Sequence, residues 1–182
     1  MAFRTVGLRC LAGAIFGVYA HPVGAQEFIH EVKIGILSHD VDHMWSGFRR
    51  EPVSADVNIE AQLSPFCTFL SGTVRPVIGG TLNTVGATSH VYTDVRWSFD
   101  LPEHTFAAIG LGGALHNGSI NRDDPHSKAL GSQLLFHIPV EFGIHLDDHR
   151  TVSAYFEHTS NANSQRFNEG LDRIGLRTGL SF

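Results

Sequence analysis

The sequence predicts an all-β fold, an eight-stranded antiparallel transmembrane β-barrel, and three observations carry that prediction. Apolar and polar residues alternate with a period of two through most of the chain, while helical periodicity is nearly absent. Eight alternating segments are each long enough to cross a bilayer as a tilted strand, which takes ~9–11 residues. Long polar connections between these segments alternate with tight turns, as they do in outer-membrane barrels.

The N-terminal segment has the pattern of a cleaved signal peptide. Two arginines precede a ten-residue apolar run (11–20), and small residues at 23–25 form a cleavage site. A cut after Ala20 also fits, and a membrane anchor is less favoured because ten apolar residues are too few to span a bilayer. We therefore expect residues 1–25 to be removed and residues 26–182 to form a single barrel domain.

The charge balance of the remaining chain argues against a nucleic-acid partner. Loss of the two N-terminal arginines leaves 11 basic and 18 acidic residues, a net charge of −7. A basic groove for nucleic acid is not expected from that balance. Cys67 is the one cysteine left, so we expect no internal disulfide and interpret Cys67 as a small buried apolar residue.

The strands are expected at about 28–38, 55–64, 73–82, 90–101, 104–115, 132–146, 150–160 and 171–182. In the fourth, apolar positions such as Val91 and Val95 alternate with charged ones, and in the sixth every even position from 134 to 146 is apolar. The last strand ends its apolar row at Phe182. Two prolines conflict with this assignment, because Pro76 and Pro139 fall inside expected strands, where proline removes a ladder hydrogen bond.

The polar rows of these strands are expected to face the barrel lumen. Their charged residues are Glu60, Arg75, Asp94, Arg96, Glu141, Arg173 and Arg177. A salt-bridged interior explains them. In this register Val140 faces lipid and Glu141 faces the lumen. We therefore expect arginine at position 140 to destabilise the barrel by ~2–4 kcal/mol, and arginine at position 141 to cost less.

The connections predict which end of the barrel faces outward. Long polar connections at 39–54, 83–89, 116–131 and 161–170 alternate with tight turns such as 101–104 and 147–150. An N-terminus delivered to the periplasm places the long connections outside the cell. We therefore expect a multi-pass barrel in the bacterial outer membrane, with the end of the seventh strand at the outer leaflet.

At that end the apolar row of the seventh strand continues into His158 and Ser160, and the matching row of the eighth begins at Asp172. Ionisable residues on a membrane-facing row are costly and point to function. A hairpin centred on residue 165 sets His158 opposite Asp172, with Cβ atoms ~5 Å apart on one face. Serine needs a histidine to take its proton, and the carboxylate fixes the imidazole tautomer. The alternative is a set of ordinary polar residues at the barrel rim, where contact with lipid has ended.

The C-terminal sequence resembles the PagL-type lipid A 3-O-deacylase family. The resemblance covers some 25 residues at the C-terminus and rests on the runs His158-Thr-Ser160-Asn161-Ala162, Asn168-Glu-Gly-Leu-Asp172 and Gly175-Leu-Arg-Thr-Gly-Leu-Ser-Phe182. The first strand, at 31–40, also resembles relatives of that family. The resemblance implies an outer-membrane barrel that binds lipid A or lipopolysaccharide in outer-membrane lipid and removes the ester-linked acyl chain at position 3, without a cofactor.

The resemblance also implies residue roles. It makes His158 the base, Ser160 the nucleophile and Asp172 the orienting acid, with Asn168 or Asn161 as oxyanion or substrate-positioning residues. The sequence departs from the family at the acid, where glutamate is usual. An aspartate reaches ~1.5 Å less far.

Three alternatives stay open. His39-Asp40-Val-Asp42-His43 has metal-binding side chains, but i, i+4 histidines mark a metal pair only on a helix, so we expect solvated loop residues and no metal. A non-catalytic structural or adhesive barrel is the second functional hypothesis, and a soluble lipocalin-like binder is a distant third. The sequence does not decide whether the chain forms a homodimer.

Overall fold

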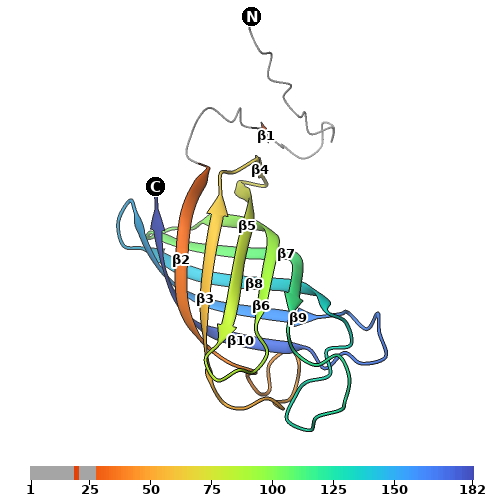
Figure 1. The fold of residues 1–182 in the computed structure, drawn as a ribbon. Coiled ribbons are helices and arrows are strands. Elements are labelled where there is room, and N and C mark those ends of the chain that lie inside the picture. Colours follow the sequence, from red (N-terminus) through yellow and green to blue (C-terminus); the bar gives the residue numbers. More distant parts are fainter. Residues whose placement is uncertain (1–18, 21–27) are drawn as a thin grey trace, which may run out of the picture.

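The wall of the molecule is a closed antiparallel barrel (Figure 1), seen here in a computed structural model that describes residues 19–20 and 28–182. Its strands are β2 (Ile29–Ser38), β3 (Ala55–Leu63), β5 (Gly72–Asn83), β6 (His90–Asp100), β7 (Thr105–His116), β8 (Leu134–His145), β9 (Arg150–Ser160) and β10 (Leu171–Ser181). All eight expected strands are confirmed, with ends that differ by at most two residues.

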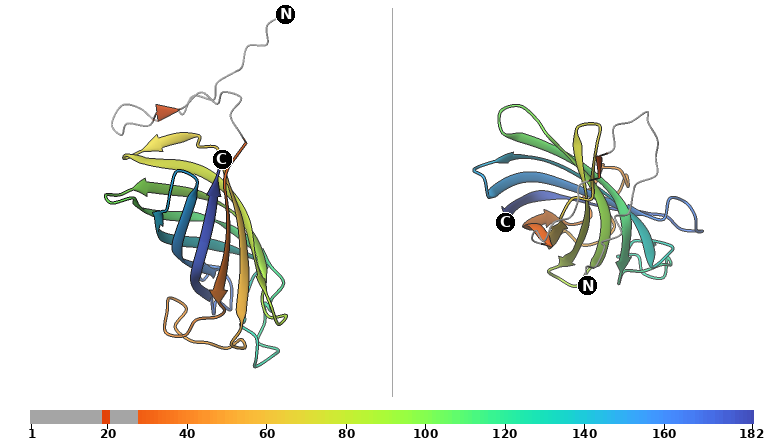
Figure 2. Two further views of the ribbon diagram at one scale, coloured as in Figure 1. Left: turned by 90° about the vertical axis from the view of Figure 1, so that its left-hand side faces the viewer. Right: turned by 90° about the horizontal axis from the view of Figure 1, so that it is seen from above.

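Closure of the barrel comes from pairing of the first and last long strands. β10 pairs with β2 from Ile174 to Ser181, and the other long strands pair with their neighbours around the ring (Figure 2). Such a ring leaves no strand edge unpaired in lipid. Within the described residues, no helix is long and apolar enough to cross a membrane.

Two short strands lie outside that ring. β1 (Tyr19–Ala20) pairs with β4 (Cys67–Phe69), and β4 pairs with the start of β5. Cys67 is buried there, as expected. The predicted signal peptide, residues 1–25, lies outside the described residues except for β1, and closure of the barrel uses none of it.

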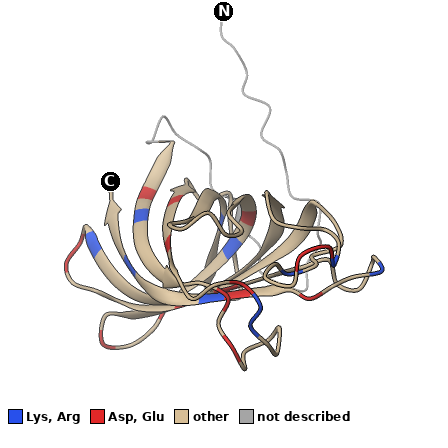
Figure 3. Ribbon diagram, turned by 60° about the horizontal axis from the view of Figure 1, so that its bottom comes forward, with Lys and Arg blue, Asp and Glu red and all other residues tan. Residues whose placement is uncertain are grey.

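The alternation of the strands separates an apolar outer face from a polar interior. Outward residues such as Ile36 and Leu176 are more than 60% exposed, as lipid-facing side chains are. Arg96, Arg173 and Arg177 are at most 2% exposed on the inner side. Figure 3 shows the charged positions along the strands and in the connections at both ends, with long uncharged stretches of wall between them.

Ion pairs fill the interior. Glu60 accepts hydrogen bonds from Arg96 and Arg177 at 3.0 Å each. Glu141 accepts one from Lys33 at 2.9 Å and another from Arg177 at 2.5 Å. The prediction of a salt-bridged interior is correct. The packing argues against the expectation that arginine costs less at position 141 than at position 140, because Glu141 is 1% exposed and paired with Lys33 and Arg177.

The two prolines lie where the ladders are interrupted. The β7–β8 ladder stops at Ile109 and Val140 and resumes at Gly112 and His137, so Pro139 falls in the gap. A Cβ at the facing Gly110 would lie 2.8 Å from the proline ring, so only glycine fits there. Pro76 lies between Val74, where the pairing of β5 with β4 ends, and Val77, where its pairing with β3 begins. Neither proline therefore costs the barrel a regular ladder bond.

The long connections gather at one end of the barrel, away from the C-terminus (Figure 1). We call 39–54 the first loop, 117–133 the third loop and 161–170 the fourth loop. The sequence predicts that His39, Asp40, Asp42 and His43 are solvated. Instead, His39 and Asp40 are fully buried, whereas Asp42 and His43 lie near the surface. Polar contacts between these loops build the region around His158.

Candidate active site

His158, Ser160 and Asp172 meet at the loop end of the β9–β10 hairpin. The ladder sets Asp172 directly opposite His158, as parity predicted. His158 Nδ1 lies 2.6 Å from Asp172 Oδ1, and His158 Nε2 lies 2.9 Å from Ser160 Oγ. An ionised carboxylate only accepts, so Nδ1 carries the proton and Nε2 accepts from the serine hydroxyl. This is the tautomer that a serine nucleophile needs in its base.

The fourth loop holds the two strands at that distance. The Asn161 backbone N–H donates to Asn168 Oδ1 at 2.9 Å, which ties the loop across its base. Gly170, just before β10, has a φ of +62°, and a Cβ there would lie 3.1 Å from His158 Cε1. A side chain at position 170 would therefore press on the imidazole. Glycine has no side chain to do so, and it also adopts the positive φ without strain.

The first loop covers the three side chains. The Trp45 ring stacks on the His158 ring, with centroids 4.5 Å apart and planes 11° apart. Ser46 donates its backbone N–H and its hydroxyl to Asp172 Oδ2, at 2.5 and 2.7 Å. As a result His158 is 5%, Ser160 8% and Asp172 0% exposed, so the three side chains are packed beneath the first loop.

The two asparagines have different hydrogen bonds. Asn161 donates its amide group to the carbonyl oxygens of Leu130 and Phe167, at 2.8 and 2.6 Å, which uses both amide hydrogens. Asn168 donates once, to Asn163 Oδ1 at 3.0 Å. One Asn168 N–H is left over, so Asn168 keeps a donor for a ligand while the Asn161 amide holds the third and fourth loops together.

A buried ionic group anchors the first loop. His39 lies between Asp56 Oδ2 at 2.8 Å and Glu51 Oε2 at 2.9 Å. Burial alone would lower the pKa of His39, but the hydrogen bonds to both carboxylates outweigh it and raise that pKa above 6.5. Burial alone would raise the pKa of Glu51, but hydrogen bonds from His39 and Thr88 lower it to about 2. The loop is therefore held by an ion pair wherever the pH lies below the raised pKa of His39.

The backbone amides of the first loop should become less protected from hydrogen exchange at alkaline pH. Because the folded pKa of His39 is raised, its ion pairs stabilise the loop fully below pH 6.5, and this contribution is lost as pH rises through the folded pKa. Hydrogen-exchange protection of residues 39–54, corrected for intrinsic rates, should fall as the pH rises above 6.5 and through the folded pKa of His39. The non-titrating variant His39→Gln should show a flatter profile. The same pH dependence in both proteins would contradict this role of His39.

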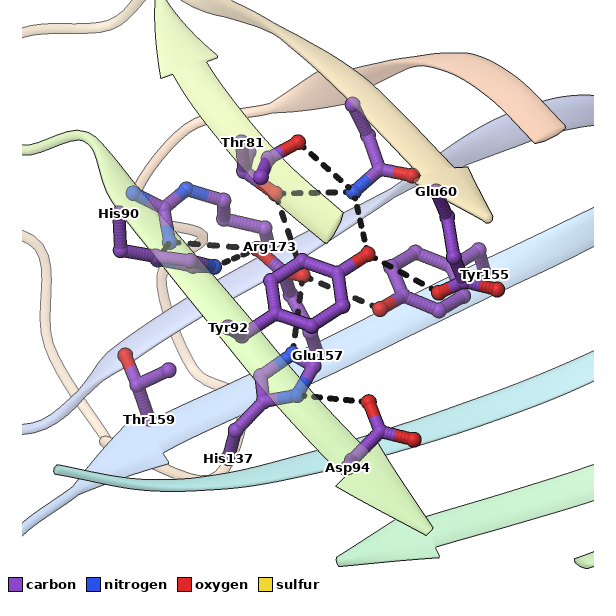
Figure 4. A network of polar contacts seen from close by, with 12 residues as sticks. Glu60, Thr81, His90, Tyr92, Asp94, His137, Tyr155, Glu157, Thr159 and Arg173 are labelled. Carbon is purple, nitrogen blue, oxygen red and sulfur yellow. Dashed lines mark hydrogen bonds and ion pairs between the residues drawn. The ribbon is translucent and has the colours of Figure 1, made fainter. Parts of the chain in front are cut away.

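A second cluster of candidate metal ligands lies inside the barrel (Figure 4): His90, His137 and Glu157, whose ligand atoms lie within 4.8 Å of one another. His137 lies 3.2 Å from Asp94 and 3.2 Å from Glu157, so both ring nitrogens donate. Arg173 donates to His90 Nδ1 at 2.8 Å, which places the His90 proton on Nε2, facing Glu157. Metal binding needs bare nitrogen lone pairs. We interpret the cluster as part of the ionic interior.

The closed barrel and this site define a class: an outer-membrane β-barrel that carries a hydrolase-type group of side chains at one rim. Residues 37–181 match the family described as lipid A 3-O-deacylase (PagL). The chain therefore belongs to the lipid A 3-O-deacylase (PagL) family. That membership and the barrel place the protein in the bacterial outer membrane.

Solved structures share the barrel. The crystal structure of the outer membrane enzyme PagL matches with a TM-score of 0.63 at 15% identity, over 84% of this chain and 99% of that one. Neisserial surface protein A (NspA) matches with a TM-score of 0.54 at 8% identity, over 84% of this chain and 96% of that one. No curated protein sequence matches the chain. At these identities the structural matches show the fold.

Proposed function

We propose that the protein is a lipid A 3-O-deacylase, a serine esterase that hydrolyses the ester-linked acyl chain at position 3 of lipid A in the outer leaflet. Family membership implies deacylase activity on lipid A. The observation that carries the mechanism is the hydrogen-bonded line from Ser160 through His158 to Asp172. Its residues continue the outward row of β9 and β10, which favours a lipid substrate over a solute in the lumen.

The proposed reaction has two steps. Ser160 Oγ attacks the ester carbonyl while His158 Nε2 takes its proton, and His158 returns that proton to the sugar oxygen as the ester bond breaks. Water then attacks the acyl-serine, His158 again takes the proton and returns it to Ser160, and the fatty acid leaves. Asp172 stabilises the imidazolium in both steps. The spare amide N–H of Asn168 is the oxyanion donor that we assign, and no cofactor takes part.

The proposed orientation follows from the loops. The site lies at the end that carries the long loops, which outer-membrane barrels expose outside the cell. The ester of an outer-leaflet lipid would then lie level with Ser160. We further propose that residues 1–25 are removed on export.

The test is expression in a Gram-negative host that lacks lipid A deacylases, followed by mass spectrometry of its lipid A. Lipid A from cells with the protein should lose one ester-linked 3-hydroxyacyl chain, and lipid A from vector-only cells should not. Unchanged lipid A, with the barrel folded in the outer membrane, would refute the proposal and favour a non-catalytic barrel. Loss of a chain from another position would refute the assigned regiospecificity.

A further inference from the structure

The acid of the candidate site is held from two sides. Asp172 Oδ1 faces His158, and Asp172 Oδ2 accepts both the backbone N–H and the hydroxyl of Ser46. Three hydrogen bonds therefore fix the plane of one fully buried carboxylate. Ser46 is 126 residues away in sequence and reaches Asp172 from the first loop.

The direction of the Ser46 hydroxyl is fixed by Lys128 of the third loop. Lys128 Nζ lies 3.1 Å from Ser46 Oγ and 2.9 Å from Asp40 Oδ1, and its side chain is fully buried. An ammonium group has no acceptor, so Lys128 donates to Ser46. The single hydrogen of the Ser46 hydroxyl is then free to point at Asp172. Donation thus runs from Lys128 to Ser46 and on to Asp172.

We propose that Ser46, oriented by Lys128, is a positioning residue for Asp172, and so for the His158–Ser160 pair. This inference rests on the proposed esterase function. The usual glutamate of the family would reach ~1.5 Å further. Here the shorter aspartate reaches His158 at 2.6 Å, and Ser46 occupies the space behind it. Through Ser46 the first loop therefore positions the acid as well as covering the site.

The first test is a double-mutant cycle on the purified full-length enzyme, with lipid A as substrate. Ser46→Ala should lower kcat by roughly 10- to 100-fold with KM little changed, as expected for one hydrogen bond to a charged group. In an Asp172→Asn background the same change should alter kcat by less than about 2-fold, because the carboxylate that Ser46 orients is gone. A purely structural role in the loop would cost activity equally in both backgrounds.

Ser54→Ala is the matched control. Ser54 lies in the same loop and hydrogen-bonds to Pro52 and Asn83, not to any of the three site residues. It should leave kcat unchanged. If Ser160→Ala is inactive but Ser46→Ala behaves like Ser54→Ala, the role of Ser46 is refuted and the esterase stands. If Ser160→Ala is active, the proposed function itself fails.

A second comparison does not depend on how Ser46→Ala folds. Asp172→Glu should reduce kcat, because the added methylene drives the carboxylate against Ser46. Adding Ser46→Gly to Asp172→Glu should recover part of the loss by vacating that space. Activity of Asp172→Glu at or above that of the unmodified enzyme would overturn the inference, as would a double variant no better than the single one.

Discussion

Replacing Ser160 by alanine should abolish release of the 3-acyl chain while the barrel stays folded, and His158→Ala should do the same. Each change removes one half of the 2.9 Å contact between nucleophile and base. Loss of either group from a serine–histidine pair costs on the order of 10⁶-fold in kcat in a well-studied protease. Lipid A mass spectrometry gives the activity, and heat-dependent migration on gels shows whether the barrel is folded.

The combined variant should be no worse than either single variant. Nucleophile and base act as one unit, so their effects do not add. Asp172→Asn should retain more activity than Ser160→Ala, because the carboxylate orients and stabilises the imidazole without reacting. Full deacylation by Ser160→Ala, in a membrane free of other deacylases, would end the serine mechanism.

Glu141→Arg should destabilise the barrel more than Val140→Arg. Val140 is on the outer face, where a basic residue at the bilayer midplane costs ~2–4 kcal/mol. Glu141 accepts hydrogen bonds from Lys33, Ser153 and Arg177 and is 1% exposed. Breaking a buried ion pair costs ~3–5 kcal/mol, and a new cation beside Lys33 and Arg177 adds repulsion. Denaturant unfolding in lipid vesicles measures both free energies.

Glu141→Gln is the control for charge alone. It keeps the shape and the acceptor oxygen of the side chain, so its cost should fall well below that of Glu141→Arg. A larger cost for Val140→Arg than for Glu141→Arg would mean that water enters the lumen and screens the ions there.

The sequence predicts the barrel well because its signals are local. Alternation fixes which residues face lipid, and hairpin parity sets His158 opposite Asp172 without any long-range assumption. Register follows from the same pattern, so the catalytic candidates and the inner row of charges could both be found.

The contacts of the loops could not be predicted in this way. Trp45, Ser46 and Lys128 lie in segments without periodicity, and their partners are far away along the chain. Nothing in the local pattern distinguishes Ser46 from Ser54. The partners of the buried ions are equally hidden, because alternation places Arg177 in the lumen but does not pair it with Glu141. Only the folded arrangement of the loops and the closed ring reveals these pairs.

Pairing of β2 with β10 brings the first loop to the proposed site. A β9–β10 hairpin alone brings His158, Ser160 and Asp172 together. Ser46, however, follows β2, and it reaches Asp172 when β2 pairs with β10. An open sheet on its way into the membrane would therefore carry a nucleophile whose acid is unsupported. If the proposed role of Ser46 holds, full activity requires the closed ring, and an unclosed barrel should be slower by the same factor as Ser46→Ala.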